Sequence, residues 1–315
     1  MGLNETNLLY GCNGEVSQTI PKPESYAFAA IMFLIIGISI FGNCLIITAI
    51  YRIQTLQTPT NALLCSLAIT DLLAPNTRIL SLAISMVMQR WVFGCNWCIA
   101  SSTLGIFFSS SSINHLCLIS IERCITIRHP YQAKNWITKR NVAMAIILVW
   151  IVSLLMSMLP FFGVGLVRFH SYLLNCEVYL EDDPKLGLLL GGMYFAIPFM
   201  VMLIVYGLIL STVRSQAKLM CTYSVGSREE KQKQKFKTEI KAMKTVLVVV
   251  GIFFLLWSPY FCTSAIEPFQ PEMIPPWWKR LNFTLVYLNS CCNWIVYGVR
   301  NKKMRSAFKN VLGFN

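Results

Sequence analysis

Residues 98–127 read CIASSTLGIFFSSSSINHLCLISIERCITI, a long and predominantly apolar run. It carries no Asp, Glu, Lys or Arg until Glu122 and Arg123, which stand side by side near its end. The hydrocarbon core of a bilayer is about 30 Å thick and needs roughly 20 predominantly apolar residues per helix. The stretch therefore predicts a helix that crosses a membrane and ends on a charged pair.

The rest of the chain repeats this pattern. Its 315 residues are 55% hydrophobic and 13% charged, with a mean hydropathy of +0.56, whereas soluble domains carry about 25% charged residues. The apolar stretches are Ala27–Ile50, Thr60–Met88, Cys98–Ile127, Asn141–Gly163, Leu186–Val213, Ala242–Cys262 and Leu281–Val299. We predict an all-α membrane protein, a seven-transmembrane helix bundle in a lipid bilayer.

A short amphipathic segment follows the seventh stretch. Within Lys302–Leu312, Met304, Phe308 and Leu312 recur every four residues among lysines. This spacing gathers the apolar side chains on one face, as in helices that lie on a membrane surface. We therefore divide the chain into a tail over residues 1–26, a membrane domain over 27–299, and a surface helix with a short tail over 300–315.

The basic residues indicate the orientation. The net charge is +13, and Lys and Arg cluster after the third and fifth apolar stretches, while acidic residues follow the fourth at 177–183. By the positive-inside rule the basic side is cytoplasmic, which predicts an extracellular N-terminus. This distribution explains the charge without a nucleic-acid partner. Asn4, in Asn4-Glu5-Thr6, is then a candidate glycosylation site.

Polar residues occur at similar depth in several apolar stretches. They are Asn43, Asp71, Ser112, Asn289 and Asn293. Polar groups inside a membrane are costly unless they are satisfied, so each is a functional candidate. A carboxylate among such oxygens can hold a small hard cation or a proton, and the alternative is a hydrogen-bond network between helices.

Short motifs recur in a fixed order along the chain. They are Gly42-Asn43, Leu67-Ala68-Ile69-Thr70-Asp71, Trp91-Val92-Phe93-Gly94, Glu122-Arg123-Cys124, Arg128-His129-Pro130-Tyr131, Trp150, Pro160, Pro198, Tyr206, Phe253-Phe254-Leu255-Leu256-Trp257-Ser258-Pro259, Asn289-Ser290 and Asn293-Trp294-Ile295-Val296-Tyr297. In this order they resemble the signatures of class A, or rhodopsin-like, G-protein-coupled receptors. The resemblance covers nearly the whole chain past residue 25.

The resemblance implies an ion site and a set of activation switches. The sodium pocket would comprise Asp71, Ser112, Asn289 and Asn293, with sodium as an allosteric modulator and no required cofactor. Arg123 would pair with Glu122 and with Glu239, in a lock between helices that breaks on activation. The core relay would comprise Pro198, Ile113 and Phe253, and the tyrosines that hold the open form would be Tyr206 and Tyr297.

The resemblance also implies a disulfide between Cys98 and Cys176, joining the third span to the second outer loop, where an oxidising exterior permits it. Cys12 and Cys95 are also predicted outside and could form a second bridge. Trp294 stands where the family usually has proline. Because proline kinks a helix by removing a hydrogen bond, this departure leaves the family's usual bend of the seventh helix open.

The seventh span, with Tyr287-Leu288-Asn289-Ser290, resembles the amine and melatonin receptors. At the place of the aspartate that binds the cation in amine receptors stands Gly105, so we do not expect a monoamine ligand. The pocket candidates are Arg78, Ile106, Ser109, Ser110, Tyr194, Phe195, Trp257, Tyr260, Phe261, Ser264, Phe283 and Tyr287. An aromatic cage with small hydroxyls suits a flat or lipid-like molecule.

Arg78 is an unusual residue in the second span. It lies seven residues after Asp71, about two helical turns nearer the outside and roughly on the same face. An arginine there either snorkels outward to the membrane surface or faces the pocket. In the second case it would pair with an anionic group of the ligand or with Glu267.

The sequence thus predicts a receptor at the plasma membrane, with an extracellular N-terminus. It would bind a small aromatic or lipid-like molecule, with an anionic group left open, and activate a heterotrimeric G protein. The G-protein contacts would be Arg123, Ile127, Pro130, Lys241 and Lys244. Tyr287 stands at the place of the retinal lysine of opsins, and no Ser/His/Asp set predicts an enzyme. The alternative is a non-signalling seven-helix protein that modulates partner receptors.

Overall fold

A computed structural model describes residues 20–162, 166–170, 173–179, 192–222, 227–267 and 269–314. Within these ranges the side chains of residues 166, 168, 179, 192, 216–222, 227–243 and 271 are not described. The glycosylation candidate Asn4 and the predicted partner of Cys95, Cys12, therefore lie outside the described residues, as do the side chains of Glu239 and Lys241.

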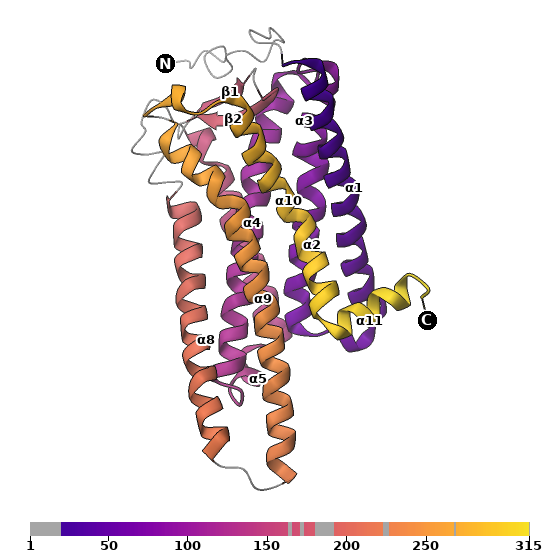
Figure 1. Cartoon of the computed structure of the whole chain (residues 1–315), viewed down its shortest axis with the longest axis vertical. Helices are drawn as coiled ribbons and strands as arrows, with labels where there is room; N and C mark the ends of the chain where they lie inside the picture. Colours follow the sequence, from indigo (N-terminus) through magenta and orange to yellow (C-terminus); the bar gives the residue numbers. More distant parts are fainter. Residues whose placement is uncertain are drawn as a thin grey trace.

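Long helices make up the bundle (Figure 1). They are α1 (Lys22–Arg52), α2 (Pro59–Ala74), α3 (Leu80–Met88), α4 (Gly94–Arg128), α6 (Lys139–Ser157), α8 (Ile197–Thr222), α9 (Ser227–Ile266) and α10 (Pro276–Arg300). Single π-helical turns, η3 (Pro75–Ile79) and η5 (Gly192–Ala196), join α2 to α3 and lead into α8. The shorter elements are η2 (Gln54–Leu56), α5 (Ala133–Trp136), η4 (Leu159–Phe162), η6 (Pro271–Met273) and α11 (Lys302–Val311).

Helices of this chain are long and apolar enough to cross a membrane over Lys22–Arg52, Pro59–Met88, Gly94–Arg128, Lys139–Ser157, Met193–Ser215 and Lys244–Ile266. The seventh helix of the bundle, α10, is less apolar because it buries the polar side chains of Asn282, Asn289 and Asn293. It packs against α9 and α1, so these groups are shielded from lipid. The predicted seven-transmembrane bundle is confirmed.

Apolar side chains on the outer faces show which solvent the bundle is built for. On α6, for example, Ile147, Leu148 and Leu155 are between 57% and 62% exposed, while Ser153 and Ser157 are fully buried. This is the reverse of a soluble helix, whose polar side chains face outward. Lipid is the solvent that such a surface requires.

Capping residues set several helix ends. The Thr58 side chain accepts a hydrogen bond from the backbone of Asn61, with Pro59 in the first turn of α2, as expected of a helix start. The fourth span was predicted to reach Gly163, but α6 ends at Ser157 and a short 3₁₀ turn follows. Pro160 explains this correction, because proline disfavours α-helical geometry in the residue before it.

A β-hairpin covers one end of the bundle. Strands β1 (Leu166–His170) and β2 (Asn175–Tyr179) pair antiparallel, and α11 lies across the bundle axis towards the other end (Figure 1). The predicted disulfide between Cys98 of α4 and Cys176 of β2 is present, with a Cα–Cα distance of 5.4 Å. Cys95 is also disulfide-bonded. The hairpin is therefore anchored directly over the helices.

A buried histidine ties α2, α4 and α6 together. His115 Nε2 lies 2.7 Å from Ser66 Oγ, and Trp150 Nε1 donates a hydrogen bond of 3.0 Å to the same oxygen. His115 is fully buried, and its Nδ1 lies 2.7 Å from the carbonyl oxygen of Ser111. Both ring nitrogens thus have partners inside the bundle, as a buried polar group requires.

Candidate functional site

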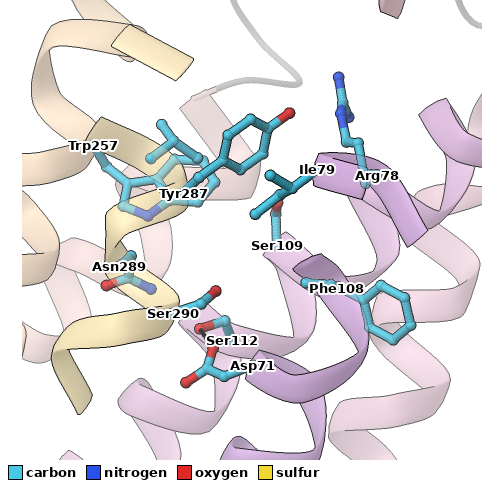
Figure 2. A pocket seen from close by; sticks show the side chains of 13 residues that line it. Asp71, Arg78, Ile79, Phe108, Ser109, Ser112, Trp257, Tyr287, Asn289 and Ser290 are labelled. Atoms are coloured by element: carbon cyan, nitrogen blue, oxygen red, sulfur yellow. Dashed lines mark hydrogen bonds between the residues drawn. The ribbon is translucent and has the colours of Figure 1, made fainter. Parts of the chain in front are cut away.

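A pocket runs inside the bundle between α2, η3, α4, α9 and α10 (Figure 2). Its lining residues are Asp71, Ala74, Arg78, Ile79, Gly105, Phe108, Ser109, Ser112, Trp257, Val286, Tyr287, Asn289 and Ser290. The lower level in Figure 2 holds Asp71, Ser112 and Ser290, and the upper level holds Arg78 and Tyr287. One continuous space therefore joins an acidic level to a basic level.

Asp71 is the centre of the lower level. It is 1% exposed, and its carboxylate accepts hydrogen bonds from Asn293 Nδ2 at 2.5 Å and from Ser112 Oγ at 3.5 Å. Asn289 lines the same pocket. The structure thus brings together the four residues of the predicted sodium pocket around one carboxylate, which is a donor set that a small hard cation accepts.

Asn43 is linked to the Asp71 segment through neighbouring backbone groups. Its Nδ2 donates to the carbonyl oxygen of Ser290 at 3.1 Å, while Ser39 Oγ donates to the carbonyl oxygen of Asp71 at 2.8 Å. These bonds join α1 to α10 and to α2 through backbone oxygens. Asn43 therefore holds helices together around the Asp71 carboxylate and does not contact it.

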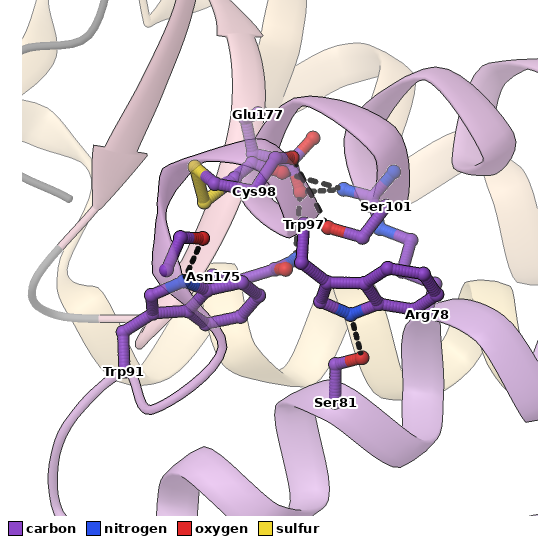
Figure 3. The surroundings of a disulfide bond; sticks show 10 residues. Arg78, Ser81, Trp91, Trp97, Cys98, Ser101, Asn175 and Glu177 are labelled. Carbon is purple, nitrogen blue, oxygen red and sulfur yellow. Dashed lines mark hydrogen bonds and ion pairs between the residues drawn. A yellow bond between two sulfur atoms is a disulfide. The ribbon is translucent and has the colours of Figure 1, made fainter.

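Arg78 occupies the upper level, and its position corrects the sequence interpretation. Its guanidinium forms an ion pair with Glu177 of β2 and donates to the carbonyl oxygen of Cys176 at 3.4 Å (Figure 3). Arg78 is 8% exposed, so it does not snorkel outward. Glu267, named as a possible partner, pairs instead with Lys279.

Three neighbours define the space around the guanidinium. The ring of Phe283 lies 5.9 Å from the Arg78 Cζ, within range of a cation–π contact. Gly105 lies so close to the Arg78 side chain that a Cβ at this position would overlap it. Burial raises the pKa of the Glu177 carboxyl, and the Arg78 charge opposes that rise. The Arg78 side chain thus occupies the space that a side chain at position 105 would need.

Several rings of the predicted aromatic cage pack on one another. Phe195 stacks on Phe261 with ring centroids 3.7 Å apart, and Trp257 continues the stack to Phe253 at 5.4 Å. Of the predicted ligand residues, Arg78, Ser109, Trp257 and Tyr287 line the described pocket, while Ile106, Ser110, Tyr194, Phe195, Tyr260, Phe261, Ser264 and Phe283 do not. The stacked rings of Phe195, Phe261 and Trp257 thus contact one another directly among the described residues.

Tyr194 shows the same effect. Its hydroxyl donates a hydrogen bond of 2.9 Å to the carbonyl oxygen of Ile106, so two predicted pocket residues satisfy each other. Tyr260 packs edge-on against Phe283, with ring centroids 5.4 Å apart. These contacts tie α4 to η5 and α9 to α10.

Arg123 lies near the opposite end of the bundle from the hairpin. Its Nε donates to Glu122 Oε2 at 2.6 Å, and its Nη2 donates to Thr60 Oγ1 at 2.9 Å. Thr60 Oγ1 in turn donates to Glu122 Oε1 at 2.7 Å. These contacts fasten the end of α4 to the start of α2. The predicted second partner, Glu239, has a side chain outside the described residues.

The predicted relay residues lie between the two ends. Ile113 and Phe253 are each 1% exposed and belong to one core cluster, and Pro198 is also buried. Tyr206 Oη accepts a bond of 3.4 Å from Ser120, whereas the buried Tyr297 hydroxyl has no hydrogen-bond partner among the described residues.

The predicted G-protein contacts differ in exposure. Pro130 and Lys244 are exposed, and Arg123 is partly exposed. Ile127 is only 4% exposed because it packs against Val205 and Ile209 of α8. Its predicted contact with a G protein requires an opened inner face, so it stays a prediction for that conformation.

Trp294 replaces the usual proline without interrupting α10, which is helical throughout Pro276–Arg300. Its indole lies against Gly42, where an added Cβ would overlap the ring, and edge-on to Phe41 at 5.8 Å. Sequence reasoning identified Trp294 and Gly42 separately but missed this contact. It also missed Glu177 as the partner of Arg78, although Glu177 directly follows Cys176 and the predicted disulfide could have located it.

Comparison with known proteins agrees with this geometry. The family described as 7 transmembrane receptor (rhodopsin family) matches residues 42–297. A Gq-coupled rhodopsin of Mizuhopecten yessoensis is 30% identical over 303 residues, which are 92% of this chain and 60% of that relative. The α-1A adrenergic receptor of Rattus norvegicus is 29% identical over 327 residues, covering 93% of this chain and 70% of the receptor.

A solved structure shows the same fold. The crystal structure of squid rhodopsin superimposes with a TM-score of 0.86 at 24% identity, covering 94% of this chain and 87% of that one. The chain spans less than two thirds of the length of the Mizuhopecten relative. The region that this chain shares with these proteins is the helical bundle.

Proposed function

The chain belongs to the rhodopsin family of seven-transmembrane receptors, and we propose that it binds a small extracellular molecule and activates a heterotrimeric G protein. The observation that carries this proposal is the closed contact of Glu122, Arg123 and Thr60 at one end of a bundle whose other end holds a pocket. A receptor needs both ends, because a ligand acts only by preferring one conformation of the switch.

The proposed orientation places the hairpin end outside the cell at the plasma membrane. The disulfide between Cys98 and Cys176 lies at that end, where an oxidising exterior would maintain it. The opposite end carries exposed basic residues of α11, among them Lys302, Lys303 and Arg305. Basic residues are favoured on the cytoplasmic side.

The proposed ligand is a small aromatic or lipid-like molecule with an anionic group. The pocket offers the Arg78 cation beside the apolar and aromatic side chains of Ile79, Trp257 and Tyr287. Pockets of this composition bind an apolar body and orient it with a few polar groups. The acid of amine receptors has no counterpart at Gly105, which lies against Arg78.

The proposed mechanism is a shift between two conformations. Ligand bound beside Trp257 would favour a repacking of the stack that includes Phe253, and so a movement of α9 relative to α4. The contact between Arg123 and Thr60 and the packing of Ile127 against Val205 and Ile209 of α8 would then open, and Arg123 and Ile127 would face a G-protein helix. Only a difference in ligand affinity between the two conformations can drive this change.

Basal coupling in cells tests the proposal. With a panel of G-protein sensors, we expect a basal signal from the wild-type chain that Arg123→Ala reduces at least about tenfold, which corresponds to about 1.4 kcal/mol. Arg90→Ala, an exposed arginine near the hairpin end, is the matched control and should leave the signal unchanged at equal surface expression. Silence of the wild type across the panel would instead favour a non-signalling partner of other receptors, in which Trp294 braces α10 against α1.

Sodium is the proposed allosteric modulator of the Asp71 level. We expect sodium chloride to raise the melting temperature of the purified wild-type protein relative to N-methylglucamine chloride, because a ligand that binds only the folded state stabilises it. Asp71→Asn removes the charge but keeps the size, and should abolish this difference. The control is Glu24→Gln, at the hairpin end, which should retain it. Equal sodium dependence of Asp71→Asn and the wild type would rule out the site.

A further inference from the structure

We propose that the upper level of the pocket is a carboxylate site, and that Glu177 occupies it in the unliganded protein as a tethered substitute for the ligand. The inference rests on the proposed receptor function and narrows its ligand class to molecules in which a carboxylate is attached to a flat apolar body. Such a ligand enters by displacing the Glu177 side chain from Arg78. The site thus has a built-in competitor.

The first argument is the charge at this level. Arg78 is the cation among the residues that line the pocket, and it lies over Gly105 so closely that no side chain fits between them. An ammonium group placed here would meet the guanidinium, whereas an anion would be attracted to it. Arginine also presents a planar fork of donors that matches the two oxygens of a carboxylate.

The second argument is that donors in this pocket lack acceptors. Arg78 Nε and Trp257 Nε1 are buried and have no hydrogen-bond partner among the described residues. The Tyr287 hydroxyl, whose oxygen points towards Arg78 (Figure 2), makes no hydrogen bond of normal geometry with the described residues. Buried donors without acceptors are unfavourable, so the pocket is completed by a ligand that brings oxygen atoms to Arg78, Tyr287 and Trp257.

The third argument is the way Glu177 is held. The residue before it, Cys176, is bonded to Cys98 of α4, and Asn175 Nδ2 donates to Glu177 Oε1 at 3.0 Å (Figure 3). The carboxylate of Glu177 is thus delivered to Arg78 by a short, covalently anchored strand. Because its side chain is 15% exposed and belongs to the middle residue of β2, a rotation of the side chain alone can release Arg78 while the disulfide stays in place.

Together these contacts explain how a buried cation is tolerated without ligand. An unpaired guanidinium inside a membrane protein would be costly, and Glu177 neutralises it until a ligand carboxylate takes its place. The exchange of one carboxylate for another conserves charge in the pocket. A neutral ligand that displaced Glu177 would leave Arg78 without a counter-charge. A cationic ligand would in addition lie unpaired beside Arg78.

Three probes with the same indole ring distinguish the effect of ligand charge from the effect of ligand shape. They are indole-3-acetate, indole-3-acetamide and tryptamine, measured by the shift in melting temperature of the full-length purified protein. We expect only indole-3-acetate to stabilise the wild type. In Glu177→Gln the competing carboxylate is absent. The apparent affinity of the protein for indole-3-acetate should therefore rise roughly ten- to hundredfold, because the binding-competent state changes from rarely to fully populated. In Arg78→Gln/Glu177→Gln, which removes both charges of the ion pair together, the stabilisation should vanish.

A charge-exchanged variant keeps the test decisive if single variants fold poorly. Arg78→Glu/Glu177→Arg preserves the ion pair but reverses which partner is tethered, so tryptamine should now stabilise the protein and indole-3-acetate should not. Equal stabilisation of the wild type by all three probes, or no stabilisation of Glu177→Gln by indole-3-acetate, would overturn the proposal. Basal coupling that depends on Arg123 would survive that result, so failure of the carboxylate site and failure of the receptor function are distinguishable.

Discussion

Cys98→Ser is expected to lower the free energy of unfolding by about 2–5 kcal/mol, the range found when native disulfides are removed. The bond joins residues 78 apart in the sequence, and cross-linking a loop of that length restricts the unfolded chain strongly. Loss of the bond also releases β2, so Glu177 would no longer be held against Arg78. Thermal unfolding of the purified protein measures the change.

Comparison of the single and double cysteine variants tests whether loss of the disulfide causes the loss of stability. Cys176→Ser and the double variant should be destabilised as much as Cys98→Ser, because each removes the same bond. Cys262→Ser replaces a free, exposed cysteine of α9 and should leave stability unchanged. A double variant that loses the sum of two single effects would contradict the disulfide as the common cause.

Gly42→Ala is expected to destabilise the protein by about 1–3 kcal/mol or more, the usual cost of overpacking a close-packed interior. The added methyl group would overlap the indole of Trp294, and that ring is also confined by Phe41. Either the ring must leave its rotamer or α1 and α10 must separate. Separation would disturb the bond from Asn43 to Ser290 next to it.

Two controls distinguish the cost of overpacking from the effect of alanine on helix propensity. One is the same substitution at Gly37, and the other is Gly42→Ala in a protein that also carries Trp294→Ala. Gly37→Ala lies on the same helix with no atom within 4 Å of the added Cβ, and should be neutral or stabilising by up to about 1 kcal/mol. With Trp294→Ala the space is vacated, so Gly42→Ala should cost much less there. An equal cost in both backgrounds would show that the indole is not the obstacle.

These two contacts hold different parts of the bundle. The disulfide ties β2, which carries Glu177, to α4, while the indole of Trp294 lies against Gly42 of α1, beside the bond from Asn43 to Ser290. A proline at 294 would remove a backbone hydrogen bond of α10, whereas the tryptophan leaves α10 helical throughout. The hairpin end and the polar centre are therefore both held by contacts between distant segments.

Local sequence determined the seven helices and the residues of the polar centre. Apolar runs of spanning length with few charges favour helices in lipid, because a helix satisfies every backbone group within the segment. Asp71, Ser112 and Asn293 could be grouped in advance because polar side chains at equal depth in a membrane seek one another. The disulfide between Cys98 and Cys176 followed from the resemblance of the whole motif series.

Tertiary structure alone decided which of these side chains meet. Arg78 could face lipid or pocket, and its pairing with Glu177 rather than Glu267 depended on how the hairpin folds over α4. Whether an aromatic residue lines a cavity or fills it depended on its neighbours, as the stack of Phe195 on Phe261 shows. Helical periodicity tells which face a residue is on, but helix rotation, loop course and side-chain packing arise only when all the segments compete for the same volume.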